Sequence, residues 1–331
     1  MGNIGSSSAP SGSDESTLVG KVISLRHGTF CTVERELARG GFSIVCACTR
    51  DSDGKKLALK RVKTQGREAE NEAMGEVRAH AILGNDAPCS EYIVPLLETH
   101  VERTGPTDRE ISLFFPLFSY GSLSDLLLKE GERIPEKRRL ELFLSCAKAV
   151  CAIHERGVAH CDIKPMNYMI ADDENHCILI DFGSARGPPL TKKIENKAEA
   201  LKEQERAERF CSAAFRSPEL WDVPHRGYEL DFSKSDVFAL GCVLYALCFH
   251  PYGYSPFESP TQGILALAAR TASVQFPQQV ADPVRGARDL ALSMLAADPN
   301  GRPTAKVVVE KVDGLLKEIS EEDFDVDFAS T

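Results

Sequence analysis

The stretch HCDIKPMN runs from His160 to Asn167 and is followed 14 residues later by the triplet DFG at 181–183. These two segments place carboxylates at Asp162 and Asp181 and an amide at Asn167. Short polar motifs recur by chance, so two unrelated polar loops are the alternative to a single site. Segments elsewhere in the chain, at compatible spacings, decide between the two interpretations.

Length and hydropathy bound the class of protein. At 331 residues with 43% hydrophobic content, the chain can bury a sizeable core in one unit with two lobes. Its most apolar stretch, Phe238 to Phe249, is too short to span a bilayer. The first 20 residues lack both the basic and the apolar region of a secretory signal. We therefore expect a cytoplasmic protein without a membrane-spanning segment.

The formal net charge of −10 is concentrated at the two ends of the chain. Residues 1–20 carry two acids and residues 318–331 carry six, which leaves the remainder near −2. This distribution offers no electrostatic surface for nucleic acid. The eleven cysteines, an odd number without a paired framework, are expected to be reduced core thiols. Cys46 and Cys48 are expected to pack in that core rather than to bind zinc.

The first part of the chain predicts a tether and a small β-rich lobe. Residues 1–30, rich in Gly and Ser toward their start, are expected to form a flexible tether. Over 31–118, strand-like alternation precedes a helical pattern at 67–83. The expected core-facing side of this helix consists of Ala69, Ala73, Val77 and Ile82.

The pattern changes to helices from Ser122 onward, which predicts a larger helical lobe over 119–317. The last stretch, 318–331, is acidic without basic residues and is expected to be a solvated tail. Together these patterns predict an α+β chain of two lobes. The clearest helical segments are 138–156, 233–248 and 286–297.

The stretch at 160–167 and the DFG triplet closely resemble the catalytic loop and the metal-binding triplet of eukaryotic protein kinases. The resemblance implies the bilobal protein kinase fold and transfer of the γ-phosphate of ATP to protein hydroxyls. It implies that Asp162 accepts or orients the proton of the substrate hydroxyl, and that Lys164 neutralises the transferring group. Asn167 and Asp181 would bind Mg²⁺, or Mn²⁺ in its place, through hard oxygen atoms.

Segments before the catalytic stretch resemble the ATP-binding parts of that family. LARGGFSIV at 37–45 lies where the glycine-rich loop is expected, with Ala38 and Ser43 in place of family glycines. The strand LALK matches the motif that places Lys60 on the α- and β-phosphates. The implied ATP site consists of Leu37, Ala38, Arg39, Gly40, Gly41, Phe42, Ser43, Val45, Ala58, Lys60, Pro116, Phe118 and Met169.

The hinge between the two lobes is expected in LFFPLFSYGSL at 113–123. Similarity to the family makes Phe115 the gatekeeper residue and places Pro116 to Phe118 beside adenine. Proline is acceptable at the first hinge position, because the family uses its carbonyl there and an amide N–H two residues later.

Lys60 is expected to be held by an ion pair with a glutamate on the following helix. Glu76, 16 residues past Lys60, is the preferred partner because it lies among the core-facing positions of that helix. Glu68, Glu70 and Glu72 are its competitors. Exchange of Glu76 for glutamine is therefore expected to reduce turnover.

One departure from the family pattern lies inside the catalytic stretch. Cys161 replaces the arginine that usually grips a phosphorylated activation loop. We therefore predict that activity does not require phosphorylation of that loop. A simple neutral replacement is favoured over a redox role for this cysteine.

The segment 181–219 is longer than in most kinases, and its centre, 191–210, is expected to be a charged helix. Thr191 is expected to cap this helix, and Glu205 is expected to pair with Arg209. With the following RFCSAAFRSPEL, the extra helix resembles the Numb-associated kinase family. The resemblance is greatest to its myristoylated and palmitoylated serine/threonine kinase branch.

This resemblance covers roughly residues 31–317 and implies further roles. Glu219 of the SPE triplet is expected to pair with Arg302, and Asp236 is expected to brace the catalytic loop. Ser212 matches the hydroxyl residue that bridges the catalytic aspartate and lysine in serine/threonine kinases. Serine and threonine acceptors on proteins are therefore expected, and activity toward tyrosine stays open.

The two ends of the chain carry separate hypotheses. MGNIGS fits the N-myristoylation pattern, with Gly2 as the acceptor after removal of Met1. One acyl chain binds membranes only marginally, and no second signal lies nearby, so reversible membrane attachment is expected. In the acidic tail, Phe324 and Phe328 are candidates for contact with an adaptor protein.

Two alternatives compete with a working protein kinase. A pseudokinase scaffold is motivated by Ala38, Ser43 and Cys161, whereas the intact Lys60 and Asp162 argue against it. A phosphotransferase acting on small molecules is the other, although the SPE segment resembles kinases with protein substrates. A measurement of nucleotide turnover distinguishes a working kinase from a pseudokinase scaffold. A comparison of protein and metabolite acceptors distinguishes it from a small-molecule phosphotransferase.

Overall fold

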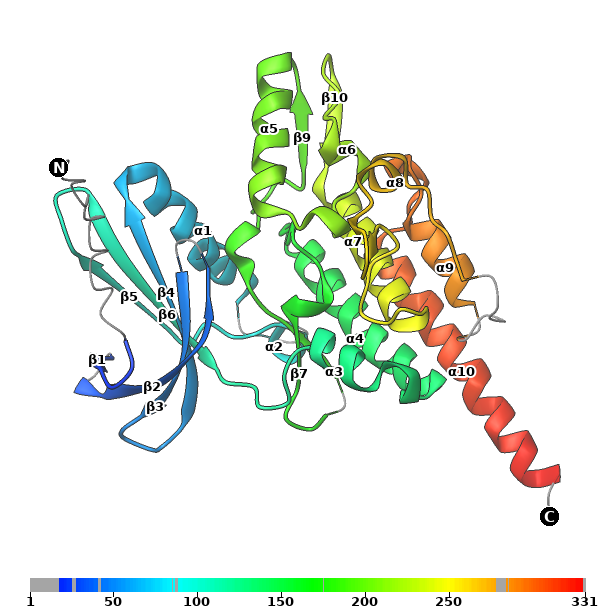
Figure 1. Ribbon diagram of the computed structural model, residues 1–331, viewed down its shortest axis with the longest axis horizontal. Helices are drawn as coiled ribbons and strands as arrows, with labels where there is room; N and C mark the ends of the chain where they lie inside the picture. The colour runs from blue at the N-terminus through cyan, green and yellow to red at the C-terminus, as the bar shows by residue number, and fades with distance from the viewer. Residues whose placement is uncertain are drawn as a thin grey trace, which may run out of the picture.

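Two lobes of different composition make up the chain in the computed structural model (Figure 1). The residues that the structure describes are 18–25, 28–40, 43–84, 86, 89–174, 176–277, 284 and 286–329, and side chains are described up to 319 except at 89 and 90. Within these residues, no helix has the length and apolar character needed to cross a membrane.

The smaller lobe is built on a six-stranded antiparallel sheet in the order β1-β2-β3-β4-β6-β5. Alternation along β4 buries Leu57 and Leu59 against Cys46, Cys48 and Phe114, as expected for strands that face a core on one side. The strands are β1 Val22–Ser24, β2 Phe30–Arg39, β3 Ser43–Arg50, β4 Lys56–Gln65, β5 Glu98–Arg103 and β6 Asp108–Pro116.

The predicted tether is wrong for its described residues. Strand β1 pairs with β2 in antiparallel register, which extends the sheet by one strand. Leu18 and Leu25 are buried in the core of this lobe beside Cys31 and Val33. These leucines bury apolar surface, which offsets the entropy of ordering the segment. Residues 1–17, including Gly2, lie outside the described part of the chain.

Helix α1, Gly66–Leu83, confirms the helical pattern predicted after β4. Its buried positions are Glu76, Ala79, His80 and Leu83, whereas Ile82 is 37% exposed. The prediction of the core-facing side of this helix was therefore wrong at Ile82. Five residues past Val77 correspond to about 140° of rotation around a helix, so the two side chains point in different directions.

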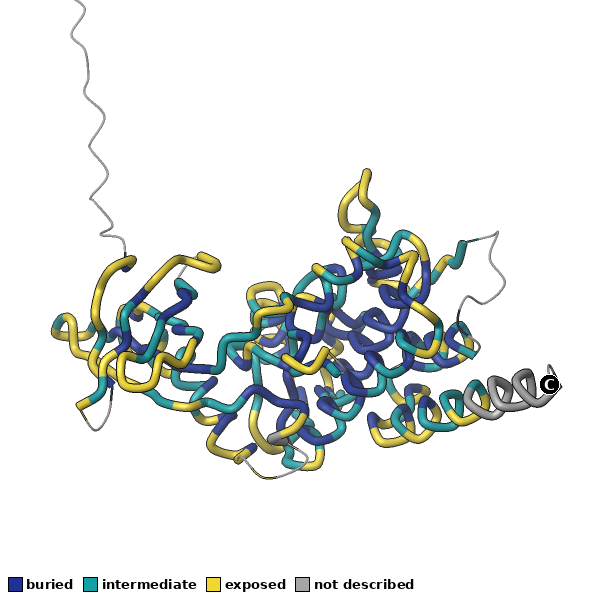
Figure 2. The backbone as a smooth tube through the Cα atoms, turned by 90° about the horizontal axis from the view of Figure 1, so that it is seen from below, coloured by how far each residue is buried: buried dark blue, intermediate teal, exposed yellow. Residues whose placement is uncertain are grey.

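The larger lobe is helical and holds most of the largest core, which also includes residues of α1 and β6 such as Leu83 and Phe115 (Figure 2). Helix α7 is buried along nearly its whole length, and α4 packs against both α7 and α10. The predicted helices correspond to α4, α7 and α9. The helices are α2 Cys89–Tyr92, α3 Leu123–Glu130, α4 Glu136–Glu155, α5 Lys197–Phe210, α6 Pro218–Trp221, α7 Phe232–Cys248, α8 Ala266–Thr271, α9 Ala287–Met294 and α10 Ala305–Ala329.

Helix α10 runs through most of the predicted acidic tail, since its backbone is helical to Ala329. The prediction of a solvated tail at 318–331 concerns its side chains, of which the structure describes only those of Glu318 and Ile319. The side chains of Phe324 and Phe328 lie outside the described residues.

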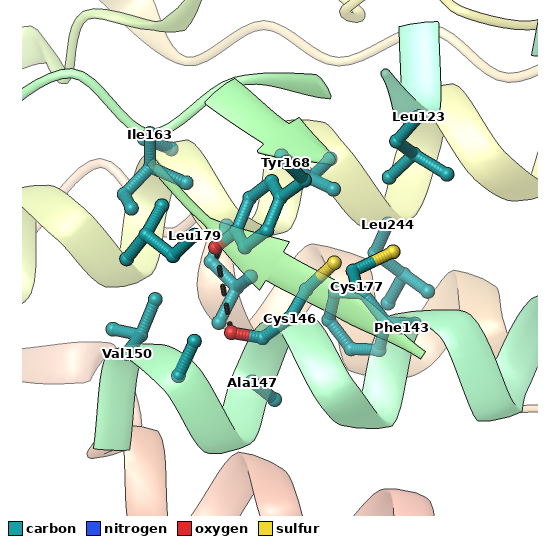
Figure 3. Packing of buried hydrophobic residues seen from close by; sticks show 14 of the residues in the cluster. Leu123, Phe143, Cys146, Ala147, Val150, Ile163, Tyr168, Cys177, Leu179 and Leu244 are labelled. Atoms are coloured by element: carbon teal, nitrogen blue, oxygen red, sulfur yellow. Dashed lines mark hydrogen bonds between the residues drawn. The ribbon is translucent and has the colours of Figure 1, made fainter. Parts of the chain in front are cut away.

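The catalytic stretch is carried by short strands over this core (Figure 3). Strands β7 Tyr168–Ile170 and β8 Cys177–Leu179 pair in antiparallel register. The Tyr168 hydroxyl donates a hydrogen bond to the Cys146 carbonyl at 3.4 Å. The described cysteine side chains are free thiols, and most are buried, in agreement with the prediction of reduced core cysteines.

The segment after the DFG triplet projects from the larger lobe as a helix with a two-stranded sheet (Figure 1). The helix predicted from Thr191 is wrong at its start, because β9 Thr191–Ile194 pairs with β10 Tyr228–Asp231. The cap of α5 is instead Asn196, whose side chain accepts from the Glu199 N–H at 3.0 Å. The predicted partner of Arg209 is also wrong, as shown below. A two-stranded sheet of short segments completes the lobe, β11 Glu258–Ser259 with β12 Gly263–Ile264.

Candidate active site

Lys60 forms the ion pair that its spacing from Glu76 predicts. Strand β4 fixes Lys60 between β3 and β6, opposite Val45 and Leu113. From there its Nζ donates to Glu76 Oε2 of α1 at 2.6 Å. The same Nζ donates to Asp181 Oδ1, also at 2.6 Å. One ammonium group therefore connects the small lobe to the DFG triplet.

The competing glutamates of α1 point elsewhere. Glu72 pairs with Arg209 of α5 at 2.8 Å, and Glu70 lies 3.8 Å from Arg109. Glu68, in the first turn of the helix, is exposed. Glu76 is selected because it is buried, at 3% exposure, on the side of α1 that faces the site.

The charges of this cluster depend on one another. Burial lowers the pKa of Lys60, but Glu76 and Asp181 outweigh this effect and raise it above its usual value. Burial raises the pKa of Asp181, but the Lys60 ammonium reverses this and lowers it to about 2. The pKa of Glu76 is raised, chiefly by burial, and the Lys60 charge opposes that rise. Lys60 therefore remains a cation that holds two acidic groups.

Asp162 is oriented by three donors. The Ser212 backbone N–H donates to Oδ1 at 2.8 Å, and Lys164 Nζ donates to Oδ2 at 2.7 Å. Asn167 Nδ2 contacts Oδ2 at 3.2 Å and the Asp162 carbonyl at 2.8 Å. Lys164 also donates to the Ser212 hydroxyl at 2.8 Å, so this serine bridges the aspartate and the lysine as the sequence resemblance predicts.

A buried carboxylate holds the catalytic stretch from beneath. Asp236 of α7 accepts from the backbone N–H groups of His160 at 2.7 Å and Cys161 at 2.8 Å. His154 Nε2 lies 3.0 Å from the same carboxylate. Cys161 has φ of 65°, a strained conformation for a residue other than glycine. The two hydrogen bonds that Asp236 accepts stabilise that turn, and the predicted bracing contact is present.

The catalytic stretch and the DFG triplet are also joined directly. The Ile180 N–H donates to the Asn167 carbonyl at 2.9 Å, immediately before Asp181. Asp181 itself has φ of 64° and accepts from the Gly183 N–H at 3.4 Å. This arrangement directs the Asp181 carboxylate toward Lys60. A continuous chain of contacts thus joins Lys60 to Asp162. It runs through Asp181, Ile180 and Asn167.

A column of rings that the sequence did not reveal packs behind this cluster. The His80 ring lies 4.9 Å from the Phe182 ring and 5.7 Å from the Phe115 ring, and Phe182 lies 5.0 Å from His160. Burial, with smaller effects from Lys60 and His160, lowers the pKa of His80 to about 4. The one feature of the sequence that could have predicted this contact is the spacing of His80 from Glu76. The two residues lie one turn apart on the same side of α1.

The predicted ATP-contacting residues lie in the small lobe and the hinge, except Met169 of the larger lobe. Ala58 pairs with Phe115 and Leu57 with Pro116, so the hinge continues directly from the strand beside Lys60. Leu37, Ala38 and Arg39 end β2, Ser43 and Val45 begin β3, and the Gly40 N–H donates to the Ser43 carbonyl at 2.8 Å. Phe118 lies in the hinge just past the end of β6, and Met169 lies in β7 of the larger lobe. Gly41 and Phe42 are outside the described residues.

The SPE segment is fixed by a buried ion pair. Arg302 donates to both Glu219 oxygens at 2.8 Å, and Ser235 donates to Glu219 at 2.9 Å. Burial raises the pKa of Glu219, but Arg302 reverses this and leaves it below its usual value. The predicted pair is therefore present. It fixes the end of the activation segment, residues 181–219, to the larger lobe.

The donor set near Asp181 fits Mg²⁺. The carboxylate oxygens of Asp181 and the amide oxygen of Asn167 are the hard ligands this ion prefers. The Asn167 amide nitrogen is committed to Asp162, which leaves its oxygen for the metal. Asp181 is 46% exposed at its side chain, so it is accessible to an ion bound with nucleotide.

Comparison with known proteins extends these observations to both lobes. A model of the protein kinase domain family matches residues 31–312. The chain is 30% identical over 285 residues to serine/threonine-protein kinase 16 of Mus musculus, covering 85% of this chain and 88% of that protein. It is 28% identical over 321 residues to serine/threonine-protein kinase ppk13 of Schizosaccharomyces pombe, covering 85% and 89%. Similarity to serine/threonine-protein kinase sel-5 of Caenorhabditis elegans, 30% over 307 residues, covers 91% of this chain and 27% of that protein.

Proposed function

Since the chain belongs to the protein kinase family and is a serine/threonine protein kinase, we propose that it transfers the γ-phosphate of magnesium-bound ATP to hydroxyl groups of proteins. The observation that carries this proposal is the contact of Lys60 with both Glu76 and Asp181, which lie far apart in sequence. Asp162 is joined to the same cluster through Asn167.

Asp162 is proposed as the residue that receives the substrate proton. Its carboxylate is held by Lys164 and the Ser212 N–H, so its position is set before the acceptor arrives. Lys164 then stabilises negative charge on the phosphoryl group as it moves. Because Lys164 also contacts the Ser212 hydroxyl, its ammonium group is placed beside the acceptor rather than free in solvent.

Lys60 is proposed to bind the α- and β-phosphates, with Glu76 holding it in place. Asn167 and Asp181 would hold Mg²⁺, which supplies positive charge against the phosphate oxygens. In this arrangement Lys60 must divide its interactions between Asp181 and the nucleotide. Its raised pKa keeps the ammonium charged throughout the physiological range.

The alternative of a pseudokinase scaffold predicts ATP binding without turnover. The test is transfer of labelled γ-phosphate to a protein acceptor, compared with the Asp162→Asn variant. Transfer by the wild type and its loss in the variant support the proposal. Absence of transfer by the wild type, with ATP bound, would favour the scaffold. Metabolite acceptors in the same assay test the small-molecule alternative.

Activity without phosphorylation of the activation segment is a second part of the proposal. It is supported by Cys161, which cannot grip a phosphate as an arginine does, and by the contacts that already fix Ser212 and Glu219. A phosphatase-treated sample, checked by intact mass, is expected to keep its activity. Loss of activity after this treatment would contradict this part of the proposal.

We further propose that the chain belongs to the myristoylated branch of the Numb-associated kinases and is attached reversibly to membranes through Gly2. The MGNIGS pattern and the helix α5 in the activation segment support this assignment. Co-expression with an N-myristoyltransferase, followed by intact-mass analysis and vesicle flotation, tests it. An unmodified Gly2 would remove the membrane claim. Adaptor binding through Phe324 and Phe328 is a separate proposal, tested by exchanging both for alanine.

A further inference from the structure

Glu203 is a buried carboxylate in helix α5 that faces two cations. It is 4% exposed and accepts hydrogen bonds from Arg186 and from Lys192, the latter at 2.6 Å. Burial raises its pKa, but these two cations reverse the effect and leave it below its usual value. The Arg186 guanidinium also lies over the Phe232 ring, 4.1 Å from its centre. Glu203 is therefore ionised at neutral pH and held by partners from outside its own helix.

Arg186 connects this carboxylate to the catalytic stretch. The Ala159 N–H donates to the Arg186 carbonyl at 3.0 Å, and the Arg186 N–H donates to the Ala159 carbonyl at 2.8 Å. Ala159 immediately precedes His160, so the backbone that leads to Asp162 is paired with the residue that Glu203 holds. Burial raises the pKa of Cys161, which stands where the family arginine would be, and the charges of Arg186 and Arg206 oppose that rise.

The far end of α5 is tied to the DFG segment and to α1. Ser184 Oγ donates to the Phe210 carbonyl at 2.9 Å, and Arg206 donates to the Ser184 carbonyl at 3.4 Å. Arg209 reaches across to Glu72 of α1 at 2.8 Å, one helical turn before Glu76. Helix α5 thus contacts the elements on both sides of the Lys60 cluster.

We propose that Glu203 is a permanent anion that takes the place of an activating phosphate and positions the catalytic stretch through Arg186. In kinases regulated by phosphorylation, a phosphate orders this segment by pairing with arginine. A phosphate carries about −1.5 to −2 charges. Glu203 carries one negative charge but is fixed in the fold. The cation that pairs with it is Arg186, and not an arginine at the position of Cys161. This inference rests on the proposed phosphoryl transfer.

The test compares Glu203→Gln with Glu195→Gln in the full-length, phosphatase-treated chain. Glu203→Gln keeps the shape of the side chain and removes its charge. Glu195 pairs with Lys193 in the same segment, but both side chains are more than half exposed. We expect kcat of Glu203→Gln to fall by about tenfold or more, with KM for ATP little changed, because the catalytic stretch rather than the nucleotide site is displaced. Glu195→Gln is expected to stay within about twofold of the wild type.

Hydrogen exchange gives a second readout that does not depend on turnover. Glu203→Gln is expected to exchange faster than Glu195→Gln at 181–219 and at 159–167, while α10 is unchanged. If Glu203→Gln does not fold, Lys192→Gln removes only the more exposed cation and is expected to change both readouts in the same direction. Equal kcat and equal exchange in the Glu203 and Glu195 variants would overturn the inference. A wild type without transfer would overturn the proposed function alone, and exchange would still decide the role of Glu203.

Discussion

At the residue scale, the site depends on one lysine held between two carboxylates. Lys60 is 16% exposed at its side chain, and Glu76 is 3% exposed. A buried charge that loses its partner is strongly unfavourable, because desolvation is no longer offset by attraction. We therefore expect Glu76 to contribute to catalysis through the position of Lys60 and not through contact with substrate.

Exchange of Glu76 for glutamine is expected to lower kcat/KM by between about tenfold and 100-fold. The amide cannot neutralise Lys60, so the lysine moves toward Asp181 and away from the phosphates. Steady-state kinetics with varied ATP measures this change. Glu70→Gln is the matched control, since Glu70 lies on the same helix and only approaches Arg109, at 3.8 Å. Normal activity in Glu76→Gln would overturn the assignment of this residue.

His80 predicts a specific pH dependence of stability. Its pKa is lowered to about 4 in the fold, mainly by burial, whereas an unfolded histidine binds its proton near pH 6.5. The unfolded chain therefore holds more protons between these values, and stability falls as the pH decreases from 6.5 to 4. The loss attributable to this group is about 3 kcal/mol at pH 4.

The His80→Leu variant is expected to lack this loss. Urea unfolding at several pH values measures the difference in unfolding free energy between wild type and variant. That difference should shift in favour of the variant as the pH decreases below about 6.5. His100→Gln, at an exposed position of β5, is the control. A difference that stays constant across the pH range would contradict this account of His80.

At the element scale, periodic patterns predicted the helices well and long-range pairing poorly. Helices α1 and α4 follow from local sequence because their buried sides repeat, and α7 follows from a continuous apolar run. Thr191 begins a strand instead of a helix because it pairs with Asp231 of β10. That partner lies 40 residues away in the sequence. No local signal specifies such a pair. The pairing of β1 with β2 is local, since Ser24 lies opposite Phe30, and it was missed because residues 1–30 were assigned as one flexible tether.

The predicted catalytic residues could be found from the sequence, whereas the contacts of α5 that hold the surrounding segments could not. The Lys60 and Glu76 pair follows from a spacing that joins one strand to one helix. The contacts of Glu203 and Arg209 could not be predicted, because both residues lie in a helix rich in charges of either sign. Only the fold decides which of those charges is buried and which faces α1.

Helix α5 is expected to hold α1 through Arg209 and Glu72. Arg209→Glu places two like charges at this contact and is expected to lower kcat by about two- to fivefold, since the pair is partly exposed. The double variant Glu72→Arg with Arg209→Glu restores opposite charges and is expected to recover most of the loss. Recovery distinguishes a specific contact from a general effect of charge. A double variant no better than the single one would rule out the proposed coupling.

At the scale of the whole molecule, the two lobes meet through polar contacts around the site. Lys60 reaches Asp181 across the lobes, and Arg156 at the end of α4 donates to the Leu83 carbonyl at 3.0 Å and to Asp86 at 2.6 Å. Beside these polar contacts the two lobes share an apolar core, since Leu83 of α1 and Phe115 of β6 belong to one hydrophobic cluster with Phe182.

The larger lobe is expected to depend on the buried pair of Glu219 and Arg302. Glu219→Gln removes one charge and leaves a fully buried guanidinium, which should cost about 3–5 kcal/mol of unfolding free energy. Chemical denaturation measures this value, and Glu195→Gln, in an exposed pair, is expected to change it by less than about 1 kcal/mol. Equal stability of the two variants would show that the Glu219 pair contributes no more than a surface contact.

The most direct test of the whole account is transfer of labelled γ-phosphate from ATP to serine and threonine in a protein acceptor, with Mg²⁺ present. The wild-type chain is expected to transfer it after phosphatase treatment. Asp162→Asn is expected to bind ATP with similar affinity and to transfer at least about 100-fold more slowly. A wild type that binds ATP without transfer, or an Asp162→Asn variant that transfers at the wild-type rate, would contradict the assignment of this site.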